Sequence, residues 1–191
     1  MAAIKNIDLS SGYKIRNEEG IFYLTLQVVL WVDIFSRQNY RDIIIDSLRF
    51  AKINKGLNVH AYVIMSNHVH MIVSVKEGKL SKVIGEFKSY TSKQIIEHIK
   101  DVSESRRTWL LELFGREGKI SSRNKSYKVW THENHPVELE STYFFDQKLN
   151  YIHENLVRAG LVYKAEDYVY SSASAYAGME SILEIEIDYL Y

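Results

Sequence analysis

The chain has 191 residues, of which 46% are hydrophobic, 13% aromatic and 25% charged, and its 24 basic and 24 acidic side chains cancel. This size and composition fit one compact globular domain and exclude a mainly disordered chain. Because there is no cysteine, disulfides and thiolate metal sites are excluded, and any metal must use His, carboxylate, amide or water ligands. We see no secretory signal and no apolar run long enough to span a bilayer, so we expect a cytoplasmic protein.

The charges are distributed unevenly along the chain. Residues 79–128 contain twelve Lys or Arg and six Asp or Glu, whereas residues 180–191 contain four acids and no base. A neutral protein with a basic middle can still present a DNA-binding face. On charge alone, a set of solvated helix surfaces is the better interpretation.

The first part of the chain predicts a strand, a helix and a hairpin. Residues 21–31 are β-branched and aromatic, which is typical of a buried strand. Ser36 suits the N-cap of a helix, and apolar residues behind it recur at helical spacing up to Gly56, where we expect that helix to end. Two runs rich in Val, Ile and aromatic residues then flank a Ser-Asn turn, which predicts a β-hairpin over residues 57–75.

The second part of the chain predicts two long helices with a less regular region between them. Apolar spacing predicts a helix over residues 80–100. We expect a short helix over 109–114, then an exposed basic loop over 115–126, and a strand over 127–131. After the only proline, a last helix is expected over residues 141–160.

The order of these elements is strand, helix, strand, strand, helix, strand, helix, which is typical of an α+β protein. We therefore expect a ferredoxin-like antiparallel sheet with helices on one face. No repeat or long linker divides the chain, so we assign residues 1–178 to one domain and residues 179–191 to an acidic C-terminal tail. The plainest interpretation of the tail is a solubilising or loosely packed end.

Two histidines are the sharpest chemical feature of the sequence. His68 and His70 stand two residues apart on a predicted strand, so both side chains leave the same face while Val69 points into the core. Two imidazoles side by side on a rigid strand supply half of a metal site. An isolated His-x-His pattern is short and common, so by itself an ordinary pair of strand histidines is the better interpretation.

The last predicted helix carries the second feature, a polar strip. Tyr151 and Asn155 are four residues apart and therefore neighbours on one helix face, and Lys148 and Arg158 extend the same strip. Beside the strip runs an apolar stripe formed by Phe145, Leu149, Ile152 and Leu156. Taken alone, Tyr151 is well explained as a half-buried tyrosine, since the chain has fourteen tyrosines.

Together the two features suit a divalent cation that acts on a phosphate. Two imidazoles and an Asn carbonyl oxygen are ligands for Mg²⁺ or Mn²⁺ and leave positions open for substrate oxygens. The tyrosine would be the nucleophile. Because a free phenol has a pKa of about 10, it needs a base, a metal or a nearby cation to attack efficiently at neutral pH. Arg and Lys on the same strip could hold the phosphate.

Several segments resemble one known family. The run HAYVIMSNHVHMIV (60–73) resembles the part of the single-tyrosine transposases that carries their His-hydrophobic-His signature. The run DQKLNYIHENLVRAGLV (146–162), followed by YSSA (170–173), resembles the catalytic helix and tail of these proteins, and WTHENHPVEL (130–139) resembles the connector before it. The likeness keeps the expected order over residues 22–177. The nearest branch looks like the REP-associated tyrosine transposases, relatives of the smallest bacterial insertion-sequence transposases.

The resemblance implies a fold of the HUH-endonuclease type and a role for each matching residue. His68, His70 and Asn155 would bind Mg²⁺ or Mn²⁺, and Tyr151 would attack the scissile phosphate and become joined to the 5′ end of the cut strand. The phosphotyrosine would keep the free energy of the ester, so a 3′-OH could reverse the step and join strands. The protein would thus be an endonuclease and strand transferase acting in DNA transposition and recombination.

The resemblance also implies the partners. Substrates of the family are single DNA strands, often flanked by imperfect hairpins such as REP sequences, and no membrane is involved. Recognition would combine phosphate contacts with base stacking. The candidate phosphate contacts are Lys148, Arg158, Arg106, Arg107, Arg123, Lys125 and Lys128. A monomer and a homodimer both stay open, as does the use of Tyr151 in cis or in trans.

One residue departs from the family pattern. Members commonly have Pro directly after the ligand Asn, where this chain has Leu156. Since Pro tends to break a helix, we expect the last helix to continue further here, which could shift Asn155.

Two alternatives to a strand-transfer enzyme remain at this stage. The protein could be a non-catalytic DNA- or RNA-hairpin-binding relative that keeps the fold, although the retention of His68, His70, Tyr151 and Asn155 argues against this. It could also be a hydrolase or a structural metal protein that uses the His pair differently. The sequence lacks a further metal motif such as His-Glu-x-x-His.

Overall fold

A computed structural model of the chain describes residues 15–101, 103–120 and 126–187. The strands in these ranges are β1 (Phe22–Gln27), β2 (Leu57–Ile64), β3 (His68–Val75) and β4 (Val137–Glu138). The longer helices are α1 (Gln38–Lys55), α2 (Leu80–Ile99), α3 (Arg107–Ile120) and α4 (Thr142–Arg158). Shorter helical turns are η1 (Val29–Trp31), η2 (Ile34–Ser36), η3 (Ala165–Asp167) and α5 (Ala173–Tyr176).

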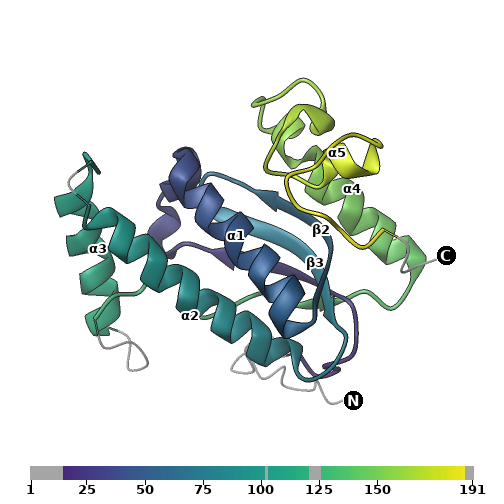
Figure 1. The fold of residues 1–191 in the computed structure, drawn as a ribbon, viewed down its shortest axis with the longest axis horizontal. Coiled ribbons are helices and arrows are strands. Elements are labelled where there is room, and N and C mark those ends of the chain that lie inside the picture. The colour runs from purple at the N-terminus through teal and green to yellow at the C-terminus, as the bar shows by residue number, and fades with distance from the viewer. Residues whose placement is uncertain (1–14, 102, 121–125, 188–191) are drawn as a thin grey trace, which may run out of the picture.

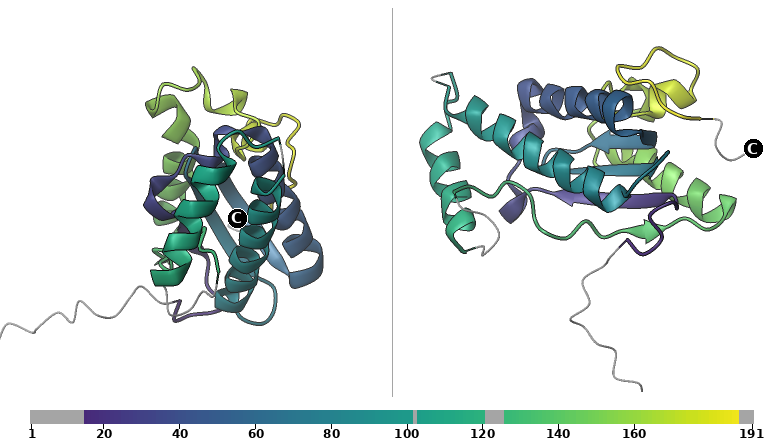
Figure 2. Two further views of the ribbon diagram at one scale, coloured as in Figure 1. Left: turned by 90° about the vertical axis from the view of Figure 1, so that its left-hand side faces the viewer. Right: turned by 60° about the horizontal axis from the view of Figure 1, so that its bottom comes forward.

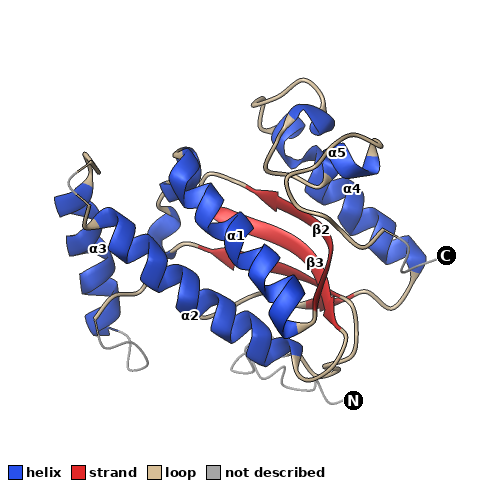
Figure 3. Ribbon diagram, viewed as in Figure 1, coloured by secondary structure: helices blue, strands red, loops and turns tan. Residues whose placement is uncertain are grey.

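The strands form one antiparallel sheet in the order β2-β3-β1-β4 (Figure 3). The predicted hairpin is confirmed: β2 and β3 are consecutive and pair, and β1 adds to the free side of β3. In that register Thr25 of β1 lies opposite His70 of β3, and Gln27 lies opposite His68. The predicted α+β class with an antiparallel sheet is confirmed.

Helices cover both faces of the sheet. Alternation along β1 sends Leu24 into the larger core, where α1 and α2 contribute residues such as Ile44 and Phe87. Figure 1 shows α1 and α2 crossing in front of the strands. The prediction of helices against one face therefore holds for α1 and α2, whereas α4 packs on the other face, where Tyr23 and Ile152 belong to a second cluster. In Figure 1 and in the right-hand view of Figure 2, α3 and α4 lie towards opposite ends of the molecule.

Some predicted boundaries are wrong, each for a physical reason. The strand expected over 21–31 ends at Gln27, because the backbone turns into the left-handed region at Leu30 and Trp31, with φ of 53° and 56°. The strand expected over 127–131 is not a regular strand: Trp130 forms an isolated bridge with Val28, just after β1, and the Thr131 N–H donates to the Gln27 carbonyl at 2.9 Å. The fourth strand is the short β4. The helix expected over 109–114 is the longer α3, which includes Gly115 and Gly118.

The described part of the acidic tail packs against the domain. Leu183 is buried in the larger core, and the backbone N–H of Glu186 donates to the carbonyl of Val59 in β2 at 2.9 Å. The carboxylate of Glu186 also accepts a hydrogen bond from the Lys52 ammonium at 3.4 Å. Within the described ranges, no helix is both long and apolar enough to cross a membrane.

Candidate active site

The two predicted histidines lie side by side on the sheet face that α4 covers. His68 and His70 alternate with Val69, which is fully buried on the opposite face. The two imidazole rings are 4.5 Å apart between centroids, and their Nε2 atoms approach to 3.0 Å. The two nitrogens thus converge on one point at the surface of the strand, as two ligands of one cation must.

Neighbouring side chains contact the Nδ1 atom of each imidazole, on the side of the ring away from the Nε2 pair. The Nδ1–H of His68 donates to the side-chain oxygen of Asn67 at 2.6 Å, and this tautomer leaves Nε2 with its lone pair. The Nδ1 of His70 lies 2.7 Å from the Tyr23 hydroxyl and 3.0 Å from the Thr25 hydroxyl. For His70 to offer Nε2 to a cation, its proton must be on Nδ1, where either hydroxyl oxygen can accept it.

Burial keeps both imidazoles neutral. It lowers the pKa of His70 from 6.5 to about 3, and the neighbouring His68 and the Lys148 ammonium act in the same direction. Burial also lowers the pKa of His68 below its usual value. Since a metal binds the neutral imidazole, neither ring has to lose a proton before it can serve as a ligand near pH 7.

Helix α4 brings Tyr151 to the His pair. The helix starts at Ser141, whose hydroxyl accepts a hydrogen bond from the Phe144 N–H, and its apolar stripe packs on the sheet. Tyr151 lies at the side of that stripe and is 39% exposed. Its ring is 5.5 Å from the His70 ring and 6.2 Å from the Tyr23 ring, nearly perpendicular to both.

Two cations flank the Tyr151 phenol. The Lys148 ammonium lies 4.6 Å from the Tyr23 ring centre and 5.6 Å from that of Tyr151, and the Arg158 guanidinium lies 4.9 Å from the latter. Lys148, Tyr151 and Arg158 also line a hollow of about 540 Å³ along α4. Burial raises the pKa of Tyr23 to about 12, so Tyr23 stays protonated. Of the two phenols beside His70, only that of Tyr151 is open to a substrate.

Asn155 is one helical turn beyond Tyr151 on the same side of α4. Its side-chain nitrogen donates to the Tyr151 carbonyl at 2.7 Å, so the amide is folded back on its own helix. Within the described ranges no contact joins Asn155 to either histidine, and no group of three His, Cys, Asp or Glu gathers at the site. The structure therefore brings His68, His70 and Tyr151 together and leaves Asn155 nearby but not joined to them.

The predicted DNA contacts in the basic middle lie elsewhere. Arg106 is engaged by Asp33 at 2.9 Å and by Glu104 at 3.7 Å, and Arg107 is exposed at the start of α3. Lys128 is half-buried, and its backbone N–H donates to Phe114 in α3. Residues Arg123 and Lys125 lie outside the described residues. The role of all five in DNA binding stays a prediction.

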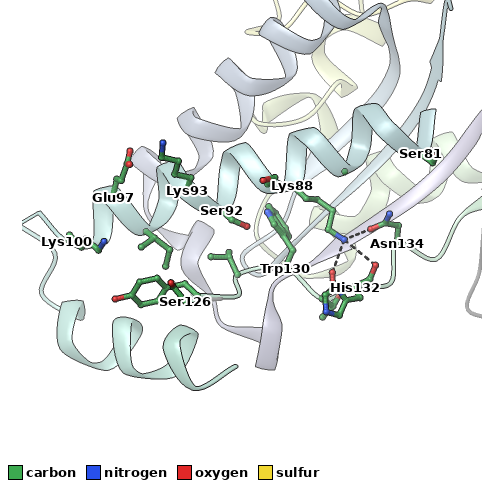
Figure 4. A pocket seen from close by; sticks show the side chains of 16 residues that line it. Ser81, Lys88, Ser92, Lys93, Glu97, Lys100, Ser126, Trp130, His132 and Asn134 are labelled. Atoms are coloured by element: carbon green, nitrogen blue, oxygen red, sulfur yellow. Dashed lines mark hydrogen bonds between the residues drawn. The ribbon is translucent and has the colours of Figure 1, made fainter. Parts of the chain in front are cut away.

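A second hollow, of about 740 Å³, lies between α2 and residues 126–134 (Figure 4). At its side Lys88 is half-buried and donates to the Thr131 carbonyl at 2.8 Å and to the Asn134 side-chain oxygen at 2.5 Å. Burial lowers the pKa of Lys88 to about 8. Sequence reasoning missed this lysine because its partners are mainly backbone oxygens.

Sequence reasoning also missed the residues that orient the histidines. Tyr23 and Thr25 are two apart on β1, so they share a face, but only the pairing of β1 with β3 brings them to His70. The sequence predicts Asn67 only as a turn residue, but its side chain also orients His68 by accepting a hydrogen bond from it.

Comparison with known proteins gives a family and a fold. Residues 32–147 match the family described as "Transposase IS200 like", a range that includes both histidines and ends before Tyr151. The structure is similar to that of a REP-associated tyrosine transposase bound to a REP hairpin, with a TM-score of 0.59 and 16% identity over 94% of this chain and 93% of that chain. A crystal structure of a proposed transposase from Deinococcus radiodurans R1 gives a TM-score of 0.42 and 16% identity over 75% of this chain and 91% of that one. A comparison with curated proteins found no match.

Proposed function

Since this chain belongs to the family of IS200-like transposases, we propose that it cleaves and rejoins single-stranded DNA through a covalent bond between Tyr151 and a 5′ phosphate. The observation that carries the proposal is the position of Tyr151, whose ring stands 5.5 Å from that of His70 on the same sheet face. A neutral His pair and an exposed phenol are the parts that phosphate transfer to tyrosine requires.

The His pair fits a divalent cation. Its two Nε2 atoms converge, both rings are neutral, and each Nδ1 has an oxygen partner. His68 and His70 would hold Mg²⁺ or Mn²⁺, which would polarise the scissile phosphate and stabilise charge on the departing oxygen. Asn155 is the proposed third ligand, and to serve it must release the Tyr151 carbonyl and turn its side-chain oxygen towards the histidines.

The chain's own residues account for the bond changes. The Tyr151 oxygen bonds to phosphorus and loses its proton, while the bond from phosphorus to the 3′ oxygen breaks and that oxygen gains a proton. The products are a 5′-phosphotyrosine and a free 3′-OH, and attack by a 3′-OH reverses the step. Lys148 and Arg158, which stand over the phenol ring, neutralise the phosphate and favour the phenolate.

The arrangement supports action in cis. The His pair on β3 and Tyr151 on α4 belong to one chain, and α4 is fixed to the sheet by Ile152 and Leu156, both buried in the second cluster. One copy would therefore hold the His pair and the nucleophile together whether the protein is a monomer or a homodimer.

The proposed substrate is single-stranded DNA next to a hairpin. The support is the fold shared with a REP-associated tyrosine transposase solved with a REP hairpin. Lys148 and Arg158 would contact the phosphates at the cut, and Arg106, Arg107, Arg123, Lys125 and Lys128 are proposed to contact the hairpin more distantly.

A covalent-trapping assay tests the proposal. Protein is mixed with labelled hairpin-bearing single strands from the flanks of the gene, with Mn²⁺ or with EDTA, and resolved on denaturing gels. We expect an adduct that requires Mn²⁺, is lost in Tyr151→Phe and persists in Tyr143→Phe, a matched control because Tyr143 is an exposed tyrosine of the same helix. Tight binding that is unaffected by EDTA, with no adduct, would instead indicate a non-catalytic hairpin-binding protein.

A further inference from the structure

An exposed tryptophan stands beside the His pair. Trp31 ends η1, directly after β1, and is 60% exposed, although a tryptophan side chain normally gains most from burial. Its ring centre is 6.1 Å from that of His68, with the two planes nearly perpendicular. The indole thus lies at the open side of the site, next to one proposed metal ligand.

The backbone holds Trp31 in an unfavourable conformation. Leu30 and Trp31 have φ of 53° and 56°, a region that residues with a Cβ rarely adopt, and here two occur in succession. The turn is held by the Trp31 N–H, which donates to the Val28 carbonyl at 3.2 Å, and by the Val28 N–H, which donates to the Asn67 carbonyl at 2.9 Å. Strain of this kind persists where the surrounding structure maintains it, and it is concentrated at functional sites.

Asn67 couples the tryptophan to the histidine. Its side-chain nitrogen donates to the Trp31 carbonyl at 3.3 Å, while its side-chain oxygen accepts from the His68 Nδ1–H at 2.6 Å. One amide therefore fixes both the turn that presents the indole and the orientation of the imidazole.

We propose that Trp31 is a base-stacking subsite, which takes an unpaired nucleobase of the strand whose phosphate lies between the His pair and Tyr151. The inference rests on the proposed function and extends it, because it assigns a nucleobase contact to a residue outside the catalytic set. Stacking on an aromatic ring suits single strands because every base has a π face. Because Asn67 is hydrogen-bonded to both Trp31 and His68, a base stacked on Trp31 would hold the adjacent phosphate at a fixed distance from His68.

Binding of a hairpin oligonucleotide with an unpaired flank tests the subsite without catalysis. All proteins carry Tyr151→Phe, and their affinities for the oligonucleotide are measured in EDTA. The protein that keeps Trp31 is compared with the Trp31→Ala and Trp31→Phe variants. Trp109→Ala is the matched control, since Trp109 is also an exposed tryptophan but lies on α3. We expect Trp31→Ala to weaken binding about 10-fold or more, Trp31→Phe to retain most of the affinity, and Trp109→Ala to lose less than Trp31→Ala.

Abasic substitutions locate the contact. At one unpaired position of the strand, removal of the base should weaken binding to the protein that keeps Trp31. The same removal should not weaken binding to the Trp31→Ala variant any further. Unchanged binding by Trp31→Ala, or equal abasic effects at every position with both proteins, would overturn the subsite. A Trp31→Ala variant that binds normally but changes oligomeric state would also overturn it and indicate a protein contact. If protein that keeps Tyr151 still forms the adduct with Mn²⁺ in these cases, only the inference about Trp31 fails. If no form of the protein binds the strand, the proposed function fails with it.

Discussion

Two regions of this molecule each withdraw a basic side chain from water, and they surround it with different partners. At the sheet face under α4, His70 is buried and neutral, and its Nε2 atom lies 3.0 Å from the Nε2 of His68. Lys88, on α2, is half-buried, and its ammonium donates to the Thr131 carbonyl and the Asn134 side chain. Desolvation alone therefore does not mark a reactive site. The two sites differ in their partners: protein oxygens accept from the Lys88 ammonium, whereas the Nε2 of His70 faces a second nitrogen able to bind a metal, that of His68.

The largest expected effect comes from removing one nitrogen of the converging pair. His70→Ala should weaken Mn²⁺ binding by at least 100-fold, because a direct ligand contributes more than the 10- to 100-fold typical of its hydrogen-bond partners. Titration calorimetry measures the affinity, and His135→Ala, outside the site, is the control. Equal affinities for His70→Ala and wild type would show that the pair does not hold the cation.

Removing the Tyr23 hydroxyl, a hydrogen-bond partner of His70 Nδ1, should weaken Mn²⁺ binding less than His70→Ala does. Tyr23→Phe deletes the hydroxyl 2.7 Å from His70 Nδ1 and keeps the ring that packs beside Tyr151. We expect about a 10-fold loss of Mn²⁺ affinity, since Thr25 still offers an oxygen to Nδ1. The same titration measures the affinity of Tyr23→Phe. A loss as large as that of His70→Ala would contradict the assignment of His70 as the ligand and Tyr23 as the residue that orients it.

The Lys88 region should respond in stability and not in metal binding. Lys88→Met leaves half-buried oxygens of Thr131 and Asn134 without this donor, which should lower the free energy of unfolding by about 2 kcal/mol. Urea denaturation measures this change. Mn²⁺ affinity should stay at the wild-type value, and a change in it would mean that the two regions are coupled.

The smallest effect concerns the pH dependence of stability and His153, a half-buried base on α4. Burial lowers the pKa of His153 from 6.5 to about 4, and the ring lies against Ser172 and Tyr176. Because the native state resists protonation, this contribution to stability is present above pH 6.5 and is lost as the pH falls towards 4. The loss should be about 1 kcal/mol by pH 5.5. His153→Gln should flatten the pH dependence of unfolding between pH 6.5 and 4, and an unchanged slope would contradict the assignment.

Much of the fold follows from local patterns, and the exceptions have local causes. Helical spacing correctly predicts α2 and α4, and β-branched runs predict the β2–β3 hairpin. Gly118 is typical of a loop, yet it lies inside α3. A glycine is needed there for packing, because a Cβ would lie 2.6 Å from the Ser126 carbonyl oxygen. The end of β1 is hidden because Leu30 and Trp31 continue its apolar pattern while their backbone leaves it.

The candidate site is predictable only in part, for a similar reason. Spacing along one strand or one helix identifies His68 with His70, and Tyr151 with Asn155. The contacts of Tyr23 and Thr25 with His70 depend on the pairing of β1 with β3, which no spacing within one segment encodes. The Asn155 ligand role stays a prediction, because its amide bonds to the Tyr151 carbonyl in this structure.

The most direct test of the central claim is to find which atom of the protein carries the DNA. Protein is incubated with Mn²⁺ and a hairpin-bearing single strand, digested with protease and nuclease, and analysed by mass spectrometry. We predict a nucleotide joined through its 5′ phosphate to the peptide that contains Tyr151, with a free 3′-OH on the released strand. A nucleotide on another tyrosine, a 3′-phosphate linkage, or no modified peptide would contradict the account.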